Sequence, residues 1–206
     1  MFITFEGCEG TGKTTLSLNL FQKIKKKFPV ILTKEPSEGN LFNIEIKKIL
    51  FKFYNKMDFY TEALLYAANR NEHLKNIIIP ALKKNKIVIC DRYLDSSIAY
   101  QGYARELGED IIKQINFLAL KYLPQITFYL DLDPRISIQR LKAKRKDKIE
   151  YFDLETINFH NKVRQGFLKL VTLYPERIHK LDSNLSLKEL ETIIQIKIEQ
   201  LLKIKI

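Results

Sequence analysis

The chain has 206 residues, 46% of them hydrophobic, and a formal net charge of +11. This length fits one α/β domain over residues 1–206 and is short for two domains of typical size. No apolar run approaches the roughly 20 residues of a membrane-spanning helix, and the first residues read as a strand rather than a secretory signal. Cys8 and Cys90 are too few for a disulfide framework or a zinc site. We therefore expect a cytoplasmic protein without a membrane partner.

The first predicted elements are a strand over 2–6 and a helix over 14–27, joined by a glycine-rich segment. Residues 7–14 read Gly-Cys-Glu-Gly-Thr-Gly-Lys-Thr, which matches the phosphate-binding pattern G-x-x-x-x-G-K-[ST]. Glycines allow successive main-chain N–H groups to face one anion at the start of a helix. A turn that only connects strand and helix is the alternative, but the flanking elements favour a nucleoside triphosphate site. Lys13 is expected to reach the terminal phosphates, and the Thr14 hydroxyl to bind Mg²⁺.

Four more strands are predicted along the chain, at 30–34, 86–91, 126–132 and 178–181. All but the last are apolar on both faces, as strands covered by helices on both sides must be. The last is more polar and suits the edge of a sheet. The alternation with helices predicts one five-stranded parallel sheet between two helical layers, with ligands at the carboxyl ends of the strands.

Signals at the helices complete this prediction. About fifty residues with helical spacing separate the second and third strands, where Pro80 is expected to kink or end a helix. Asp133-Pro134 resembles an N-cap followed by the first helical position, and residues 186–189 fit a capping box. The last helix is expected to present four side chains to the core, namely Leu190, Ile194, Ile198 and Leu201.

The third predicted strand ends in Asp91-Arg92-Tyr93. A carboxylate in this place is expected near Mg²⁺ in a chain with a phosphate loop, so Thr14 and Asp91 are the candidate metal ligands. Arg92 can bind a second phosphate group in bidentate fashion. The alternative is that Asp91 and Arg92 form a purely structural ion pair at the end of the strand. Asp131 also ends a strand, but the residues after it indicate strand exit and helix capping.

Residues 91–102, Asp-Arg-Tyr-Leu-Asp-Ser-Ser-Ile-Ala-Tyr-Gln-Gly, are similar to the signature of thymidylate kinases. Residues 5–15 resemble that family's phosphate loop, and weaker matches lie at 34–36 and 66–70. The motifs are in the family's order, and the resemblance extends over essentially the whole chain. It implies a P-loop kinase fold and transfer of the γ-phosphoryl group of ATP to dTMP, giving dTDP for dTTP synthesis. It also implies a homodimer.

The resemblance implies a role for each matching side chain. Tyr66 would stack on the thymine ring. The apolar residues next to it in the sequence would, by themselves, favour packing in the core instead. Arg70 would donate to a thymine carbonyl, with Ser97 and Gln101 completing the contacts at the base edge. Tyr100 would lie against the deoxyribose and disfavour a 2′-hydroxyl.

The remaining implied roles concern the phosphates. Glu9 and Asp91 would sit near the sugar hydroxyl or the Mg²⁺ shell, while Arg92 and Lys34 would hold the acceptor phosphate. The implied ATP contacts are Gly7, Cys8, Glu9, Gly10, Thr11, Gly12, Lys13, Thr14 and Thr15. The implied substrate contacts are Glu35, Pro36, Lys48, Tyr66, Arg70, Arg92, Ser97, Tyr100 and Gln101. The implied catalytic side chains are Lys13, Arg92, Arg145 and Glu9.

A basic segment follows the fourth strand, and residues 140–148 read Arg-Leu-Lys-Ala-Lys-Arg-Lys-Asp-Lys. The resemblance implies a lid at about 140–150, of the bacterial subtype that supplies its catalytic arginine from the lid. Arg145 or Arg140 is expected to close over the transferred phosphate. The alternative is a basic turn exposed to solvent.

The histidines, at 73, 160 and 179, show no arrangement typical of a general base or a metal site. That fits an acceptor that is already a phosphate monoester, because its second pKa near 6 leaves an anionic oxygen at neutral pH. A kinase acting on a hydroxyl would need a carboxylate base, for which Glu35 is the candidate.

The chain departs from the family's usual pattern in three places. Residues 34–39 read Lys-Glu-Pro-Ser-Glu-Gly where the family commonly has Arg-Glu-Pro-Gly-Gly. Lys48 stands where an arginine often contacts the acceptor phosphate, and a lysine offers a point charge in place of a bidentate fork. The lid is richer in lysine than usual.

Two other readings stay open at this point. The acceptor could be another nucleotide or a deoxynucleoside. The positive charge also permits a nucleic-acid-binding ATPase, but no aromatic and basic stacking platform is evident, so we expect no nucleic acid partner. A catalytically silent partner protein is disfavoured because Lys13, Thr14 and Asp91 are all present.

Overall fold

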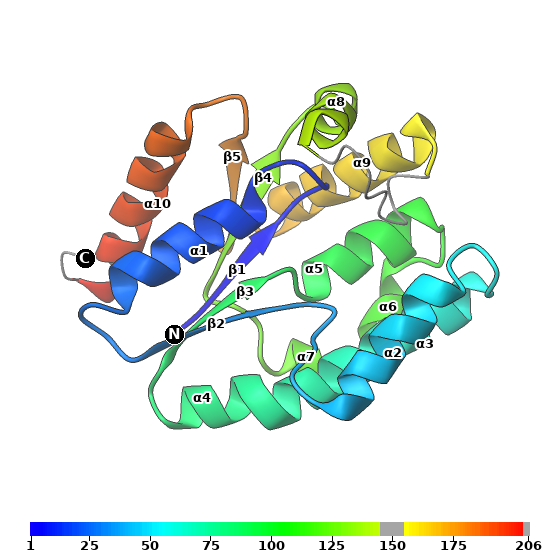
Figure 1. Ribbon diagram of the computed structural model, residues 1–206, viewed down its shortest axis with the longest axis horizontal. Helices are drawn as coiled ribbons and strands as arrows, with labels where there is room; N and C mark the ends of the chain where they lie inside the picture. Colours follow the sequence, from blue (N-terminus) through cyan, green and yellow to red (C-terminus); the bar gives the residue numbers. More distant parts are fainter. Residues whose placement is uncertain (145–154, 204–206) are drawn as a thin grey trace.

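The computed structural model describes residues 1–144 and 155–203, and a five-stranded sheet lies at its centre (Figure 1). All strands are parallel, in the order β2-β3-β1-β4-β5. The strands are β1 (Phe2–Glu6), β2 (Val30–Lys34), β3 (Ile87–Asp91), β4 (Ile126–Asp131) and β5 (Ile178–Asp182). The predicted sheet is confirmed, with three boundaries shifted by one residue, and the polar β5 does lie at an edge.

Helices connect the strands. They are α1 (Lys13–Ile24), α2 (Leu41–Lys52), α3 (Phe59–His73), α4 (Ile79–Lys83), α5 (Leu94–Ser97), α6 (Glu109–Ile115), α7 (Phe117–Leu120), α8 (Pro134–Lys144), α9 (Ile157–Leu173) and α10 (Leu187–Leu202). Two π-helical segments, η1 (Leu74–Ile78) and η2 (Ile98–Ala104), continue α3 and α5. Among the described residues, no helix has the length and apolar character needed to cross a membrane.

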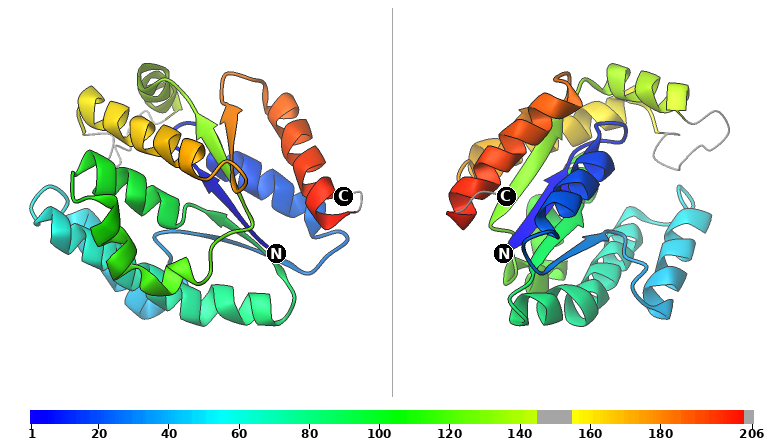
Figure 2. Two further views of the ribbon diagram at one scale, coloured as in Figure 1. Left: turned by 180° about the vertical axis from the view of Figure 1, so that it is seen from behind. Right: turned by 60° about the vertical axis from the view of Figure 1, so that its left-hand side comes forward.

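The two faces of the sheet carry separate hydrophobic cores, because alternate side chains of a strand point to opposite faces. On one face Ile3 and Phe5 belong to a core that includes Leu16 of α1, and α1 and α10 lie side by side there (Figure 1). On the other face Phe2 belongs to the core that includes Phe167, and α9 crosses the sheet when it is seen from behind (Figure 2). The three-layer arrangement is therefore confirmed.

Two expectations about helices need correction. Of the two outcomes expected at Pro80, an end to the helix is wrong, because η1 continues into α4 and Pro80 lies in the first turn of α4, where the missing N–H is tolerated. Leu201 is 46% exposed, and Leu202 packs against the core instead. The buried ridge of α10 keeps a spacing of four residues from 190 through 198, so it continues at 202.

Candidate active site

The loop between β1 and α1 depends on glycine at its first position. Gly7 has a φ of 138°, and an added Cβ there would lie 2.6 Å from the carbonyl oxygen of Leu130 on β4. Only glycine, which has no Cβ, can adopt this positive φ and still lie so close to the main chain of β4. Gly10 and Gly12 also have positive φ values. The loop therefore turns tightly against the sheet, as the motif predicts.

Lys13 begins α1 and is held against this loop. Its side chain is buried, and Nζ donates to the carbonyl oxygen of Cys8 at 2.6 Å. The hydroxyl of Thr11 donates to the same oxygen at 2.9 Å. Burial, with a smaller contribution from the nearby Arg92, lowers the pKa of Lys13 to about 8. The ammonium group lies where the loop would place an anion, and an anionic ligand would offer it a stronger partner than a carbonyl oxygen.

Thr14 and Asp91 meet at the carboxyl edge of the sheet. Thr14 Oγ1 donates to Asp91 Oδ2 at 2.5 Å, while Asp91 Oδ1 is buried and has no partner in the described part of the chain. A hydroxyl beside a carboxylate with a spare oxygen is the kind of donor set that Mg²⁺ prefers. No described group of three or more His, Cys, Asp or Glu side chains is arranged to hold an ion. These two residues fit Mg²⁺ if phosphate oxygens and water complete its shell.

Arg92 follows β3 with a φ of 70°, a conformation uncommon outside glycine. Its guanidinium donates to Glu9 and, at 3.1 Å, to Ser96 Oγ, and it lies 5.1 Å from the ring centroid of Tyr100. The Tyr100 hydroxyl bonds to both oxygens of Glu9, at 3.0 and 2.9 Å. Burial raises the pKa of Glu9, but Arg92 and Lys13 reverse that shift and lower it overall. A charged cluster therefore connects the loop to the end of β3.

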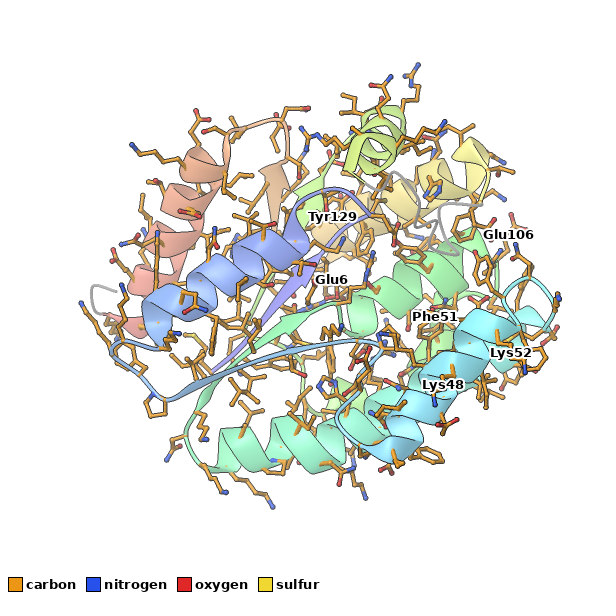
Figure 3. All side chains as sticks on the ribbon, viewed as in Figure 1. Glu6, Lys48, Phe51, Lys52, Glu106 and Tyr129 are labelled. Atoms are coloured by element: carbon orange, nitrogen blue, oxygen red, sulfur yellow. The ribbon has the colours of Figure 1, made fainter. Side chains whose placement is uncertain are left out.

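Glu6 supports the turn that carries Arg92. It is fully buried at the end of β1 (Figure 3), and its carboxylate accepts from the main-chain N–H of Tyr93 at 2.7 Å and from the Ser96 hydroxyl. Burial raises the pKa of Glu6 to about 8. Glu6 therefore holds the turn at Arg92 in two ways. It binds the side chain of Arg92 through Ser96, and it binds the backbone of the turn at the N–H of Tyr93. Sequence reasoning missed Glu6, which reads as the last residue of a strand.

Arg70 on α3 is fixed by partners from several elements. Its Nε donates to Glu35 at 2.7 Å and its Nη1 to Asn116 at 2.6 Å. Its Nη2 donates to Ser97 Oγ at 2.9 Å and to the Tyr93 carbonyl oxygen at 3.2 Å. These bonds set the plane of the guanidinium, and the second N–H of Nη1 has no hydrogen-bond partner among the described residues. Arg70 can therefore offer one N–H to a ligand in a defined direction.

Glu35 is shared between Arg70 and His73. His73 is fully buried, with Nδ1 3.0 Å from Glu35 Oε1 and Nε2 2.7 Å from the hydroxyl of Thr33. A carboxylate committed to two side chains is not a free base, which weakens the reading of Glu35 as the base of a hydroxyl kinase. His73 was also missed, although its spacing of three from Arg70 puts both on one face of α3.

Most of these groups line one cleft of about 390 Å³, whereas Glu6 and His73 do not line it. The expected site residues that line it are Glu9, Gly10, Gly12, Lys13, Thr14, Thr15, Lys34, Glu35, Pro36, Tyr66, Arg70, Asp91, Arg92, Ser97, Tyr100 and Gln101. Gly7, Cys8 and Thr11 belong to the loop but are buried and do not line the cleft. The structure thus brings the loop motif and the signature after β3 together, as the sequence predicts.

Lys48 does not line the cleft, so the structure does not support its assignment to the acceptor phosphate, which stays a prediction. Its side chain is 66% exposed on α2 (Figure 3) and pairs with Glu45 at 2.7 Å. Lys47 and Phe51 line the cleft in its place. One residue along a helix is a rotation of about 100°, so neighbouring lysines face different surroundings.

Of the two candidate lid arginines, only Arg140 lies among the described residues. Arg140 lies on α8 and donates to the carbonyl oxygen of Ser183, after β5, at 3.0 Å, and it does not line the cleft. The structure therefore does not support Arg140 as the catalytic arginine. Arg145 and most of the expected lid lie outside the described residues, so their assignment stays a prediction.

Comparisons with known proteins agree with this geometry. The family model described as thymidylate kinase matches residues 5–194. A thymidylate kinase from Aster yellows witches'-broom phytoplasma is 57% identical, over 99% of each chain. One from Acholeplasma laidlawii is 45% identical, over 98% of this chain and 99% of the relative. A crystal structure of thymidylate kinase from Ehrlichia chaffeensis has a TM-score of 0.76 at 36% identity, over 97% of this chain and 98% of the other.

Proposed function

This chain belongs to the thymidylate kinase family, and from that premise we infer that it transfers the γ-phosphoryl group of ATP to dTMP, giving dTDP. The observation that carries the inference is the meeting of two anion-binding groups in one cleft, the loop with Lys13 and the turn with Arg92. Both lie at the carboxyl edge of the sheet, where this class of fold binds ligands. Another acceptor, or a nucleic-acid-binding ATPase, is not favoured.

The donor site uses the phosphate loop. We assign the triphosphate to the loop's main-chain N–H groups and to the start of α1, with Lys13 on the terminal phosphates. Thr14 and Asp91 would hold Mg²⁺, which offsets phosphate charge when it is bound with ATP. Lys13, with its pKa near 8, is largely charged at neutral pH and gains an anionic partner when ATP binds.

The acceptor phosphate belongs beside Arg92. The guanidinium already faces the cleft, held by Glu9, Ser96 and Tyr100, so its direction is set before a ligand arrives. An acceptor phosphate is anionic at neutral pH and needs no general base. The protein's contribution is then to align the two phosphates and to surround them with positive charge.

The base belongs at the other end of the cleft. Tyr66 offers a flat ring on α3, and the remaining N–H of Arg70 matches a carbonyl oxygen such as O4 of thymine. Ser97 acts through Arg70, because it accepts a hydrogen bond from that guanidinium. Tyr100, buried between Arg92 and Glu9, would lie against the sugar.

A panel of acceptors tests this function. With ATP and Mg²⁺, we expect dTMP to give the highest kcat/KM among dTMP, dCMP, dAMP, dGMP and thymidine, measured by coupled release of ADP. Chelating the metal should abolish turnover, and added single-stranded DNA should leave ATP hydrolysis unchanged. Preference for another acceptor would contradict the assignment of the base site.

We also propose a homodimer. The packed helices α2 and α3 expose many large apolar side chains, namely Leu41, Phe42, Ile49, Phe59, Tyr60 and Leu64. A monomer rarely leaves such a group in water, and a second copy of the chain would cover it. Light scattering should give twice the 24.3 kDa of one chain, and a mass of 24.3 kDa at micromolar concentration would contradict the proposal.

The cysteines bear on the cellular location. Cys8 and Cys90 are both free and buried. Free thiols are usual in a reducing compartment, which supports our proposal that the enzyme works in the cytoplasm.

A further inference from the structure

A buried carboxylate, Glu62, lies at the base end of the cleft and has no role in the function proposed above. Glu62 is 3% exposed and sits on α3 one turn before Tyr66. Its Oε1 accepts a hydrogen bond from Nε2 of Gln101 at 2.8 Å. Gln101, on η2, is itself 2% exposed and lines the cleft. Burying a carboxylate costs free energy unless hydrogen bonds or opposite charges compensate. The burial of Glu62 against the Gln101 amide therefore suggests that the carboxylate acts on that amide.

The chemistry of the two groups determines how Gln101 is oriented. A carboxylate has lone pairs and no hydrogen, so it accepts hydrogen bonds and never donates them. The carboxamide of Gln101 must therefore turn its N–H side toward Glu62, which directs its oxygen elsewhere. Among the described residues, no hydrogen bond to Gln101 Oε1 is found. That oxygen is left for a ligand in the cleft.

Arg105 favours the charged form of Glu62. Its Nη2 lies 3.4 Å from Glu62 Oε2 and 2.7 Å from Glu155 Oε1. Its guanidinium is 4.4 Å from the ring centroid of Phe59 and 4.6 Å from that of Phe159, so it is fixed between two aromatic rings. Burial raises the pKa of Glu62, and the Arg105 charge opposes that shift without cancelling it. Arg105 therefore stabilises Glu62 through Oε2, while the other carboxylate oxygen, Oε1, accepts from Gln101.

We propose that Glu62 is a positioning residue that sets the hydrogen-bonding polarity of the base pocket, selecting pyrimidines whose N3 carries a hydrogen. The inference rests on the proposed function, which puts the base beside Gln101. Thymine has a donor at N3, whereas neutral cytosine has a lone pair there. If the Gln101 oxygen faces the cleft, the N3 lone pair of cytosine would meet another hydrogen-bond acceptor. Neither the Gln101 oxygen nor the cytosine N3 would then be hydrogen-bonded.

The change Glu62→Gln tests this role, because glutamine has nearly the same shape but can donate as well as accept. The Gln101 amide could then adopt either orientation. We expect the ratio of kcat/KM for dTMP to that for dCMP to fall at least tenfold, with a higher KM for dTMP and an unchanged KM for ATP. Some selectivity should persist, because the Arg70 N–H still opposes the amino group of cytosine.

The ratio does not depend on the folded fraction of the enzyme, so a purely structural role of Glu62 would not change it. Glu62→Met is the second variant, since it removes both the acceptor and the charge, and we expect the same loss of selectivity. Glu106→Gln, at an exposed glutamate (Figure 3), is the matched control and should leave the ratio unchanged. A ratio within twofold of wild type in either Glu62 variant would overturn the positioning role. A wild-type enzyme that fails to phosphorylate dTMP would instead refute the proposed function.

Discussion

Replacing Lys13 with methionine is expected to lower kcat by about 1,000-fold or more. Methionine keeps a long apolar stem in the buried position beside the loop, so the fold should persist, but it lacks the charge that offsets the transferred phosphoryl group. Within residues 1–144 and 155–203 the ammonium group donates only to the Cys8 carbonyl oxygen, so little of the loop depends on it. Steady-state kinetics with varied ATP and dTMP would measure the loss, and circular dichroism would check the fold.

A helix neighbour and a pH profile control this experiment. Lys23→Met, on the side of α1 that faces α10, should stay within about twofold of wild type, because Lys23 pairs with Glu191 and does not line the cleft. Lys13 in the free protein loses its charge as the pH rises through about 8. ATP affinity should therefore weaken above pH 8 in the wild type, and this dependence should be absent from Lys13→Met. A loss of kcat below tenfold would contradict the role of Lys13.

The sheet and the phosphate loop could be predicted because their signals are local. Each strand is a short apolar run, and the loop combines glycine spacing with a preceding strand and a following helix. The adjacency of Asp91 to Thr14 also followed from the sequence, since parallel strands end at one edge and that edge holds the loop. The resemblance to thymidylate kinases added the expected reaction, which composition and spacing alone did not supply.

The partners of the site residues could not be predicted in the same way. Arg70 is held by Glu35 after β2, by Ser97 on α5 and by Asn116 between α6 and α7, and no local pattern relates these segments. One signal was available, because positions 62, 66, 70 and 73 recur at helical spacing and three of them are polar or charged. That pattern marks a buried polar face of α3, and it would have pointed to both Glu62 and His73.

The lining of the cleft differs from the assignment that the resemblance implies by one residue on a helix. Lys47 and Lys48 are chemically identical neighbours, and the motif comparison selected the second. In the structure Lys47 lines the cleft, whereas Lys48 pairs with Glu45 at the surface. The direction of a helical side chain depends on how the whole helix packs, and α2 packs against α3 through contacts that the sequence does not specify.

Replacing Arg92 with methionine is expected to lower kcat/KM for dTMP by about 100-fold, or roughly 2.7 kcal/mol, mainly through a higher KM. The guanidinium offers a planar fork to the acceptor phosphate, and its direction is fixed by Ser96 and Tyr100. Arg92→Lys retains the charge without the fork, so it should recover only part of the loss. Saturation kinetics with dTMP at fixed ATP would measure both variants.

The loss in Arg92→Met has two physical sources, which a further variant separates. Removing the guanidinium takes away the phosphate contact, and it also leaves the buried Glu9 without the cation that lowers its pKa. If the uncompensated charge of Glu9 were the whole cause, the double variant Glu9→Gln with Arg92→Met would recover most of the activity. We expect less than about threefold recovery, because glutamine removes the buried charge but adds nothing that binds the acceptor phosphate. Recovery to within tenfold of wild type would instead mean that Arg92 acts chiefly by neutralising Glu9.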